Sequence, residues 1–369
     1  MNRAVAPKIS RQSAFQAKNT ATVALATPKA ATRSVASIRR PFGTFKELTL
    51  TEQAVKSGRT SSLCVSNAMA TTSPATFLED EDKQSFIDTV DTFIFDCDGV
   101  IWKGDSIIEG VPEALDMLKA KGKKMIFVTN NSTKSRAGYL SKFHGLGLTN
   151  VKAEEIFSSS FAAAAYFQSI NMKKKVYVVG EVGIQEELDL AGIAHIGGPE
   201  DGDKKIDLSP GQFMEHDPDV GAVCVGFDRN INYYKIQYAT LCLRENPGCV
   251  FVGTNLDAVT HLTSAQEWAG NGSMVGAIKG SSGKEPVVVG KPAPFMLDYI
   301  CEQNNIKPEQ ICMVGDRLDT DIQFGIDGGL RTLLVLSGVT TEETLKSPEN
   351  AIQPDYYVSA MPDMLSVFK

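Results

Sequence analysis

The feature that most constrains this chain is an apolar run that ends in two carboxylates. Residues 92–96 are typical of a buried strand, and Asp96 and Asp98 stand at its end, one residue apart. Residues two apart on extended backbone point the same way, so both acids can face one ligand. Adjacent carboxylates repel unless a cation or a proton intervenes. The spacing therefore indicates a hard metal ion, Mg²⁺, with one acid left to attack or to transfer a proton. The alternative is an ordinary strand-end turn.

Strand-like and helix-like segments alternate along the chain, which predicts a parallel sheet with helices on both faces. Further strands are expected at 124–129, 175–179, 222–225, 249–252, 287–289, 311–314 and 331–336. Helices are expected at 110–121, 136–144, 160–169, 233–244, 294–303 and 320–326.

A segment with loop-like and Gly-rich stretches interrupts this alternation of strands and helices. Residues 198–219 are loop-like, and the Gly-rich stretch 270–283 is interpreted as a turn leading to a hinge. We therefore predict an α/β, Rossmann-like core at 86–180 and 286–369, interrupted by a smaller α/β cap domain at 181–285.

Charge is distributed unevenly. Residues 1–68 hold 11 Lys and Arg but only two acids, Glu47 and Glu52. The net charge of the whole chain is −7, and residues 69–369 alone carry −16. The first segment is also rich in Ser, Thr and Ala and has no central apolar block, which predicts a disordered chloroplast transit peptide at 1–68 and a stromal location. A basic tail that binds an acidic partner is the alternative.

The acidic remainder argues against nucleic-acid or anionic-membrane partners. No apolar run approaches the roughly 20 residues of a membrane-spanning helix. The seven cysteines are scattered without C-x-x-C pairs, which argues against a zinc site.

Polar residues follow three further predicted strands. The second strand ends in Thr129 and Asn130, Lys291 follows 287–289, and Asp316 and Asp321 follow 311–314. Each alone could be a helix cap or an acidic first turn. In open parallel sheets, however, ligands bind outside the carboxyl ends of the strands. Because all of these residues would then lie at one edge of the sheet, together with Asp96 and Asp98, they indicate phosphoryl transfer.

In that chemistry Asp96 would attack phosphorus to form an aspartyl-phosphate. Asp98 would protonate the leaving oxygen and later deprotonate the attacking water. Asp96, Asp98 (through its backbone carbonyl) and Asp316 would hold Mg²⁺, which stops nucleophile and phosphate from repelling one another.

The remaining polar residues would bind phosphate or support those that do. Thr129 and Lys291 would bind the equatorial oxygens that carry the charge of the transition state, with the Asn130 amide beside them. Asp321 would orient metal-bound waters or Lys291.

These segments resemble the four motifs of the haloacid dehalogenase (HAD) superfamily, at 96–100, 128–132, 290–292 and 315–321. The superfamily's dehalogenases lack an acid at position 98 and its P-type ATPases carry threonine there, so Asp98 implies a hydrolytic phosphatase. The inserted segment resembles the type-C2 cap of the NagD-like and 4-nitrophenylphosphatase-like group at 225–228, 233–235 and 253–257.

Within that group, residues 315–321 are similar to phosphoglycolate and pyridoxal phosphatases. With a plastid-like leader, the resemblance implies hydrolysis of 2-phosphoglycolate to glycolate and phosphate, as in photorespiration. Pyridoxal phosphate or a broad set of small phosphorylated metabolites is the alternative. The resemblance further implies a homodimer joined through the cap, and cap residues Asn255 and His261 near the substrate. A surface or half-buried histidine without a role in binding is the other interpretation of His261. A silent phosphate-binding protein is disfavoured because every motif residue is present.

Overall fold

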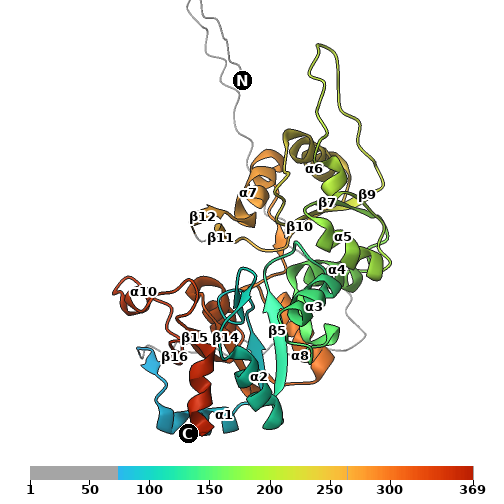
Figure 1. Ribbon diagram of the computed structural model, residues 1–369. Helices are drawn as coiled ribbons and strands as arrows, with labels where there is room; N and C mark the ends of the chain where they lie inside the picture. The colour runs from blue at the N-terminus through green and yellow to red at the C-terminus, as the bar shows by residue number, and fades with distance from the viewer. Residues whose placement is uncertain (1–73, 264, 369) are drawn as a thin grey trace, which may run out of the picture. The chain divides into compact units, whose positions relative to one another are not determined.

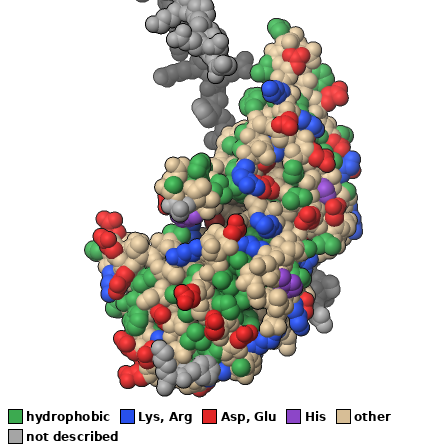
Figure 2. All heavy atoms as spheres, in the orientation of Figure 1, with side chains coloured by type: hydrophobic (Ala, Val, Ile, Leu, Met, Phe, Trp, Pro, Cys, Tyr) green, Lys and Arg blue, Asp and Glu red, His purple; other side chains and the backbone are tan. Residues whose placement is uncertain are grey.

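The computed structural model describes residues 74–263 and 265–368 (Figure 1). The transit peptide expected at 1–68 lies outside these residues. Among the helices that are described, none combines the length and the apolar character needed to cross a bilayer. Acidic side chains are spread over the face shown in Figure 2, in keeping with the net charge of −16 outside 1–68.

A seven-stranded parallel sheet forms the core, in the order β1-β16-β15-β14-β2-β5-β6. Its strands are β1 (Thr76–Phe77), β2 (Thr92–Phe95), β5 (Lys124–Thr129), β6 (Ile156–Ser158), β14 (Ile311–Gly315), β15 (Arg331–Val335) and β16 (Tyr356–Val358). The middle strand β2 pairs with β14 on one side and β5 on the other, with Phe95 opposite Val314 and Phe127. The polar residues that follow these three strands therefore meet at one edge, as the predicted α/β fold requires.

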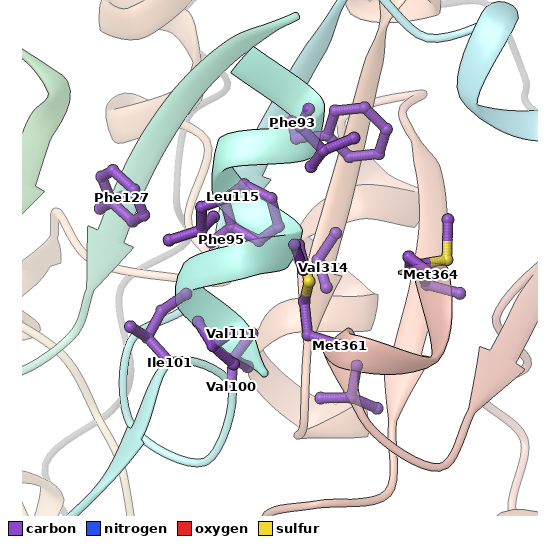
Figure 3. Close-up of a cluster of buried hydrophobic side chains, with 14 of the residues drawn as sticks. Phe93, Phe95, Val100, Ile101, Val111, Leu115, Phe127, Val314, Met361 and Met364 are labelled. Atoms are coloured by element: carbon purple, nitrogen blue, oxygen red, sulfur yellow. The ribbon is translucent and has the colours of Figure 1, made fainter. Parts of the chain in front are cut away.

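Helices cover both faces of this sheet because side chains alternate along each strand. Phe93 and Phe95 enter a cluster with α1 (Asp80–Asp88), α2 (Val111–Ala120), α3 (Arg136–Gly145) and the 3₁₀ segment η5 (Met361–Phe368). Figure 3 shows part of this cluster, including Phe93, Phe95, Phe127, Leu115, Met361 and Met364. Ile94 faces the other way, toward α4 (Ser159–Ser169) and α8 (Phe295–Asn304).

The second sheet is also parallel, in the order β13-β10-β9-β7-β8. Its strands are β7 (Lys175–Val179), β8 (His195–Gly197), β9 (Val220–Val225), β10 (Val250–Gly253) and β13 (Val287–Val288). Val176 and Val178 share an apolar cluster with Ile94 and with α5 (Val182–Leu190), whereas Tyr177 and Val179 pack with α6 (Tyr233–Glu245) and α7 (Asn271–Ser282).

Shorter elements connect these parts. They are two antiparallel hairpins, β3 (Trp102–Lys103) with β4 (Ser106–Ile107) and β11 (Val259–Thr263) with β12 (Gln266–Ala269), then η1 (Ala153–Glu155), η2 (Gly198–Asp201), η3 (Pro308–Gln310), the π-type turn η4 (Leu318–Ile322), α9 (Gln323–Asp327) and α10 (Glu342–Lys346).

Two strands belong to a different sheet from the one expected. The prediction that assigned 175–179 to the first sheet is wrong, because β7 pairs with β8 and β9. Likewise β13 pairs with β10, so the second sheet extends beyond both ends of the predicted 181–285 cap. Both sheets are parallel and buried, so their strands have the same apolar character, and only the pairing assigns them.

The turn expected at 270–283 is also wrong, because this stretch forms the helix α7. Met274, Val275 and Ile278 bury one face of it. Gly272 fits there for a packing reason, since an added Cβ would lie 2.6 Å from the Leu256 carbonyl oxygen. Packing of the apolar face has overridden the low helix propensity of glycine.

Candidate active site

Lys291 lies between two carboxylates at the edge where β2, β5 and β14 end. Its Nζ is 2.5 Å from Asp96 Oδ1 and 2.7 Å from Asp321 Oδ1, and it donates to the Val128 carbonyl at 3.1 Å. Burial by itself lowers the pKa of Lys291, but the facing charges of Asp321 and Asp96 outweigh burial and raise that pKa. The lysine is therefore held as a cation in a buried site.

The carboxylates around it are crowded. Burial raises the pKa of Asp96 well above its usual value; Lys291 opposes this shift, and Asp321 and Asp316 add to it. Burial, with Asp321 second, raises the pKa of Asp316 to about 7. One oxygen from each of Asp96, Asp316 and Asp321 lies within 4.8 Å of the others. A single lysine does not balance three such acids, so the cluster favours a further cation.

The hydrogen bonds show which oxygens can hold that cation. Asp321 is fully engaged, since its Oδ1 meets Lys291 and its Oδ2 accepts the backbone N–H groups of Asp316 and Arg317, each at 3.1 Å. Asp316 Oδ2 accepts the Val339 N–H at 2.7 Å. Within the described residues no donor bonds Asp96 Oδ2 or Asp316 Oδ1. These two hard oxygens fit Mg²⁺, whereas Asp321 fits the supporting position expected for it.

Asp98 lies on the loop between β2 and β3, and its side chain is exposed. Its Oδ1 accepts the indole N–H of Trp102 at 2.8 Å. The loop turns at Gly99, whose φ is +84°, and the Gly99 N–H donates to the Trp102 carbonyl at 2.7 Å. The next residues, Val100 and Ile101, are buried in the cluster of Figure 3, which anchors the loop.

Gly99→Ala is expected to lower kcat/KM by about 100-fold or more, because displacements of about 1 Å in an active site have effects of this size. The added Cβ would lie 2.5 Å from Asp316 Oδ2, on backbone in the left-handed region. Gly104→Ala is a matched control: φ there is +58°, but the Cβ would meet nothing within 4 Å. Denaturant unfolding should show a backbone strain of about 1–2 kcal/mol in both variants, with a further loss in Gly99→Ala from the contact with Asp316, and activity should fall only in Gly99→Ala. Equal activities would contradict the prediction.

Thr129 and Asn130 end β5, and both are buried. Thr129 Oγ1 accepts the Asn131 N–H at 3.1 Å. The Asn130 side chain binds the peptide group of Lys291: its Oδ1 accepts the Lys291 N–H at 2.8 Å and its Nδ2 donates to the Lys291 carbonyl at 2.9 Å. Asn130 was expected beside the phosphate, and in the structure its amide fixes the backbone that carries Lys291.

The cap residues expected near the substrate lie in different surroundings. Asn255 is buried, and its Nδ2 donates to the Asn130 carbonyl at 2.7 Å. His261 lies on β11 with 47% of its side chain exposed, 3.9 Å from Glu267 Oε1. The structure thus brings Asn255 to the loop that follows β5. His261, by contrast, makes no contact with the described acids of the core.

Sequence reasoning missed two contact residues of this site. Asp257 Oδ1 accepts the second Asn130 Nδ2 bond at 3.0 Å, so a residue of the cap segment touches the group that holds Lys291. Trp102, the other, bonds Asp98. The sequence feature that could have indicated them is their position, since Asp257 lies near Asn255 and Trp102 lies near Asp98. A cavity of about 360 Å³ between α4 and α8, lined by Gln168, Phe295, Asp298, Tyr299 and Glu302 among others, contains none of the site residues.

Comparison with known proteins gives consistent matches. Residues 93–194 match the model of the haloacid dehalogenase-like hydrolases, and 288–364 match a HAD-hydrolase-like model. Phosphoglycolate phosphatase 1A, chloroplastic, of Arabidopsis thaliana is 66% identical over 83% of this chain and 83% of its own length. Phosphoglycolate phosphatase 2 of the same plant is 55% identical over 78% and 96%. In the solved structure of the p-nitrophenyl phosphatase from Archaeoglobus fulgidus, the chain is 32% identical to this one, with a TM-score of 0.64 over 75% of this chain and 98% of that one.

Proposed function

Because the chain belongs to the haloacid dehalogenase-like hydrolases and is a phosphatase of that family, we propose that its substrate is 2-phosphoglycolate. The products would be glycolate and phosphate, formed through an aspartyl-phosphate on Asp96. The observation that carries the chemistry is the buried group of Asp96, Lys291, Asp316 and Asp321 at the edge of the parallel sheet. The substrate rests on the 66% identity to a chloroplastic phosphoglycolate phosphatase.

The residues of the site divide the steps of this mechanism among them. Asp96 attacks phosphorus with Oδ1, the oxygen beside Lys291, and the bond from phosphorus to the glycolate oxygen breaks. Asp98 gives its proton to that leaving oxygen. As a carboxylate it then takes a proton from the water that hydrolyses the phosphoenzyme. Thr129 and Lys291 hold the equatorial phosphate oxygens, where charge accumulates.

Asp96 Oδ2, Asp316 Oδ1 and the backbone carbonyl of Asp98 would hold Mg²⁺. When bound, the ion supplies positive charge that reduces the repulsion between the nucleophile and the phosphate. Asp321 keeps its two backbone bonds and orients Lys291. We assign Asn130 to the same task, through the Lys291 peptide group.

The cap would recognise the rest of the substrate. Asn255 bonds both the Asn130 carbonyl and the Asp257 N–H, so it holds the cap segment against the phosphate side. His261 is exposed on a hairpin of that segment and would meet the substrate carboxylate when the segment closes. These two residues are therefore proposed to affect the choice of substrate.

We further propose a location in the chloroplast stroma and a homodimer joined through the cap. The location is supported by the chloroplastic relative and by the composition of 1–68. The dimer is supported by family resemblance and by Leu262 and Trp268, apolar residues exposed on β11 and β12. Fluorescent-fusion imaging and sedimentation equilibrium test the two proposals; a cytosolic signal or a monomer would contradict them.

A kinetic panel on the purified protein tests the substrate and the metal. We expect kcat/KM for 2-phosphoglycolate to exceed that for pyridoxal 5′-phosphate and 4-nitrophenyl phosphate by about tenfold or more, since a site that pairs a substrate's charged group rejects analogues lacking it. Chelation should abolish turnover and added Mg²⁺ should restore it, which excludes damage by the chelator. A flat profile would favour a broad-specificity phosphatase. Turnover that survives chelation would contradict the metal.

A further inference from the structure

We propose that Trp102 is a positioning residue for proton transfer: its indole N–H holds the Asp98 carboxylate in the orientation from which it serves the leaving oxygen. The proposal rests on the acid–base role given to Asp98 under the proposed function. Asp98 is exposed, so no packing selects its rotamer. The bond from Trp102 Nε1 to Asp98 Oδ1, at 2.8 Å, is the side-chain hydrogen bond that the structure gives this carboxylate.

Burial, ring contacts and backbone hydrogen bonds hold Trp102 in place. It is fully buried, and its ring meets the edge of Phe143 at a centroid distance of 4.8 Å. The Lys142 ammonium lies 4.3 Å from the ring centroid. Its backbone N–H donates to the Cys97 carbonyl at 3.2 Å, and its carbonyl accepts the Gly99 N–H at 2.7 Å. A donor held in this way fixes the orientation of the exposed Asp98 carboxylate that it binds.

The chemistry of the indole group then distinguishes the two oxygens of Asp98. An indole N–H donates and cannot accept, so Oδ1 must be an acceptor while this bond lasts. The transferred proton therefore belongs on Oδ2. It passes from Oδ2 to the glycolate oxygen as the bond from that oxygen to phosphorus breaks and the bond from Asp96 to phosphorus forms. Oδ2 regains a proton from the water that later attacks the phosphoenzyme.

Leaving-group dependence is the readout that separates this role from a structural one. 4-Nitrophenolate leaves without a proton, whereas the alkoxide of glycolate needs one. In Trp102→Phe we expect the ratio of kcat/KM for 2-phosphoglycolate to kcat/KM for 4-nitrophenyl phosphate to fall about tenfold or more. The parameter kcat/KM is used because it covers the steps up to departure of the leaving group and excludes phosphoenzyme hydrolysis.

Phe143→Leu is the matched control, because it loosens the packing around the indole ring and keeps the N–H donor. It should lower the melting temperature and leave the ratio unchanged. If Trp102→Phe does not fold, a tryptophan analogue with sulfur in place of the indole nitrogen keeps the ring shape and removes the donor. The same fall in the ratio is expected with that analogue.

Asp98→Asn separates failure of this proposal from failure of the proposed function. If Asp98→Asn lowers the ratio and loss of the Trp102 donor does not, the positioning role is overturned and the acid–base role stands. If Asp98→Asn leaves the ratio unchanged, the acid–base role fails and the positioning role fails with it. Equal losses on both substrates in Trp102→Phe would show a structural role and would also overturn the proposal.

Discussion

Asp96→Asn is expected to abolish turnover of every phosphomonoester, with kcat lower by about 10⁴-fold or more, the size of effect seen when a nucleophile is removed. The substitution keeps the shape of the side chain, so binding groups such as Lys291 and Asp316 remain. What it removes is the anionic oxygen that attacks phosphorus. Steady-state assays on 2-phosphoglycolate and 4-nitrophenyl phosphate measure the loss, and mass spectrometry of acid-quenched protein tests for the phosphoenzyme.

Asp105→Asn is the matched control, an identical change at an exposed acid on the turn between β3 and β4. It should retain wild-type kinetics and form the phosphoenzyme. Turnover of Asp96→Asn within tenfold of wild type would reject Asp96 as the nucleophile. Phosphate binding without turnover by the wild-type protein would instead favour the silent phosphate-binding alternative.

Stability should change in the opposite direction from activity. Burial raises the folded-state pKa of Asp96, so its charged form opposes folding above the pKa of an unfolded carboxyl, about 3.9. Without metal, Asp96→Asn should therefore be at least as stable as wild type at neutral pH. The difference should shrink as the pH falls and wild-type Asp96 becomes protonated. Thermal melts in chelator from pH 4 to 8 measure it.

The positions of the reacting groups were predictable because a parallel sheet fixes them. Once 92–96, 124–129 and 311–314 are identified as neighbouring parallel strands, Asp96, Thr129 and Asp316 must meet at one edge. The predicted supporting role of Asp321 depends on side-chain direction, which the sequence does not give. The structure shows that direction, with both oxygens already engaged by Lys291 and backbone N–H groups.

The contacts that orient these groups were not predictable from residue types. Asn130 is equally suited to bind a phosphate or a peptide group, and tertiary structure places the Lys291 backbone against it. Trp102 has the sequence pattern of a core residue, and its polar edge gains a role only because the loop turns at Gly99. The sheet to which β7 and β13 belong could not be predicted for a related reason, since pairing between distant strands is not encoded in the residues of either strand.

Lys291→Met is expected to lower both activity and stability. It removes the cation that balances Asp96 and Asp321 and the donor that holds the transferring phosphate, so kcat/KM should fall by about 10³-fold. The free energy of unfolding should fall by about 3–5 kcal/mol, because two buried carboxylates lose their partner. Lys235→Met is the matched control, since Lys235 is equally buried and lies 2.6 Å from Asp228 in the second sheet's domain. It should lose comparable stability and keep most activity on 4-nitrophenyl phosphate.

The pH dependence shows whether electrostatics causes the loss of stability. Lys291 lowers the pKa of Asp96, so its removal raises that pKa further. An acid whose folded-state pKa is raised destabilises the fold at higher pH, and the penalty disappears as the pH falls below about 3.9, where the unfolded carboxyl is also protonated. The stability deficit of Lys291→Met should therefore be largest at neutral pH and shrink in acid, in urea titrations with chelator. A deficit independent of pH would mean that lost packing of the lysine stem, and not the uncompensated carboxylates, destabilises the variant.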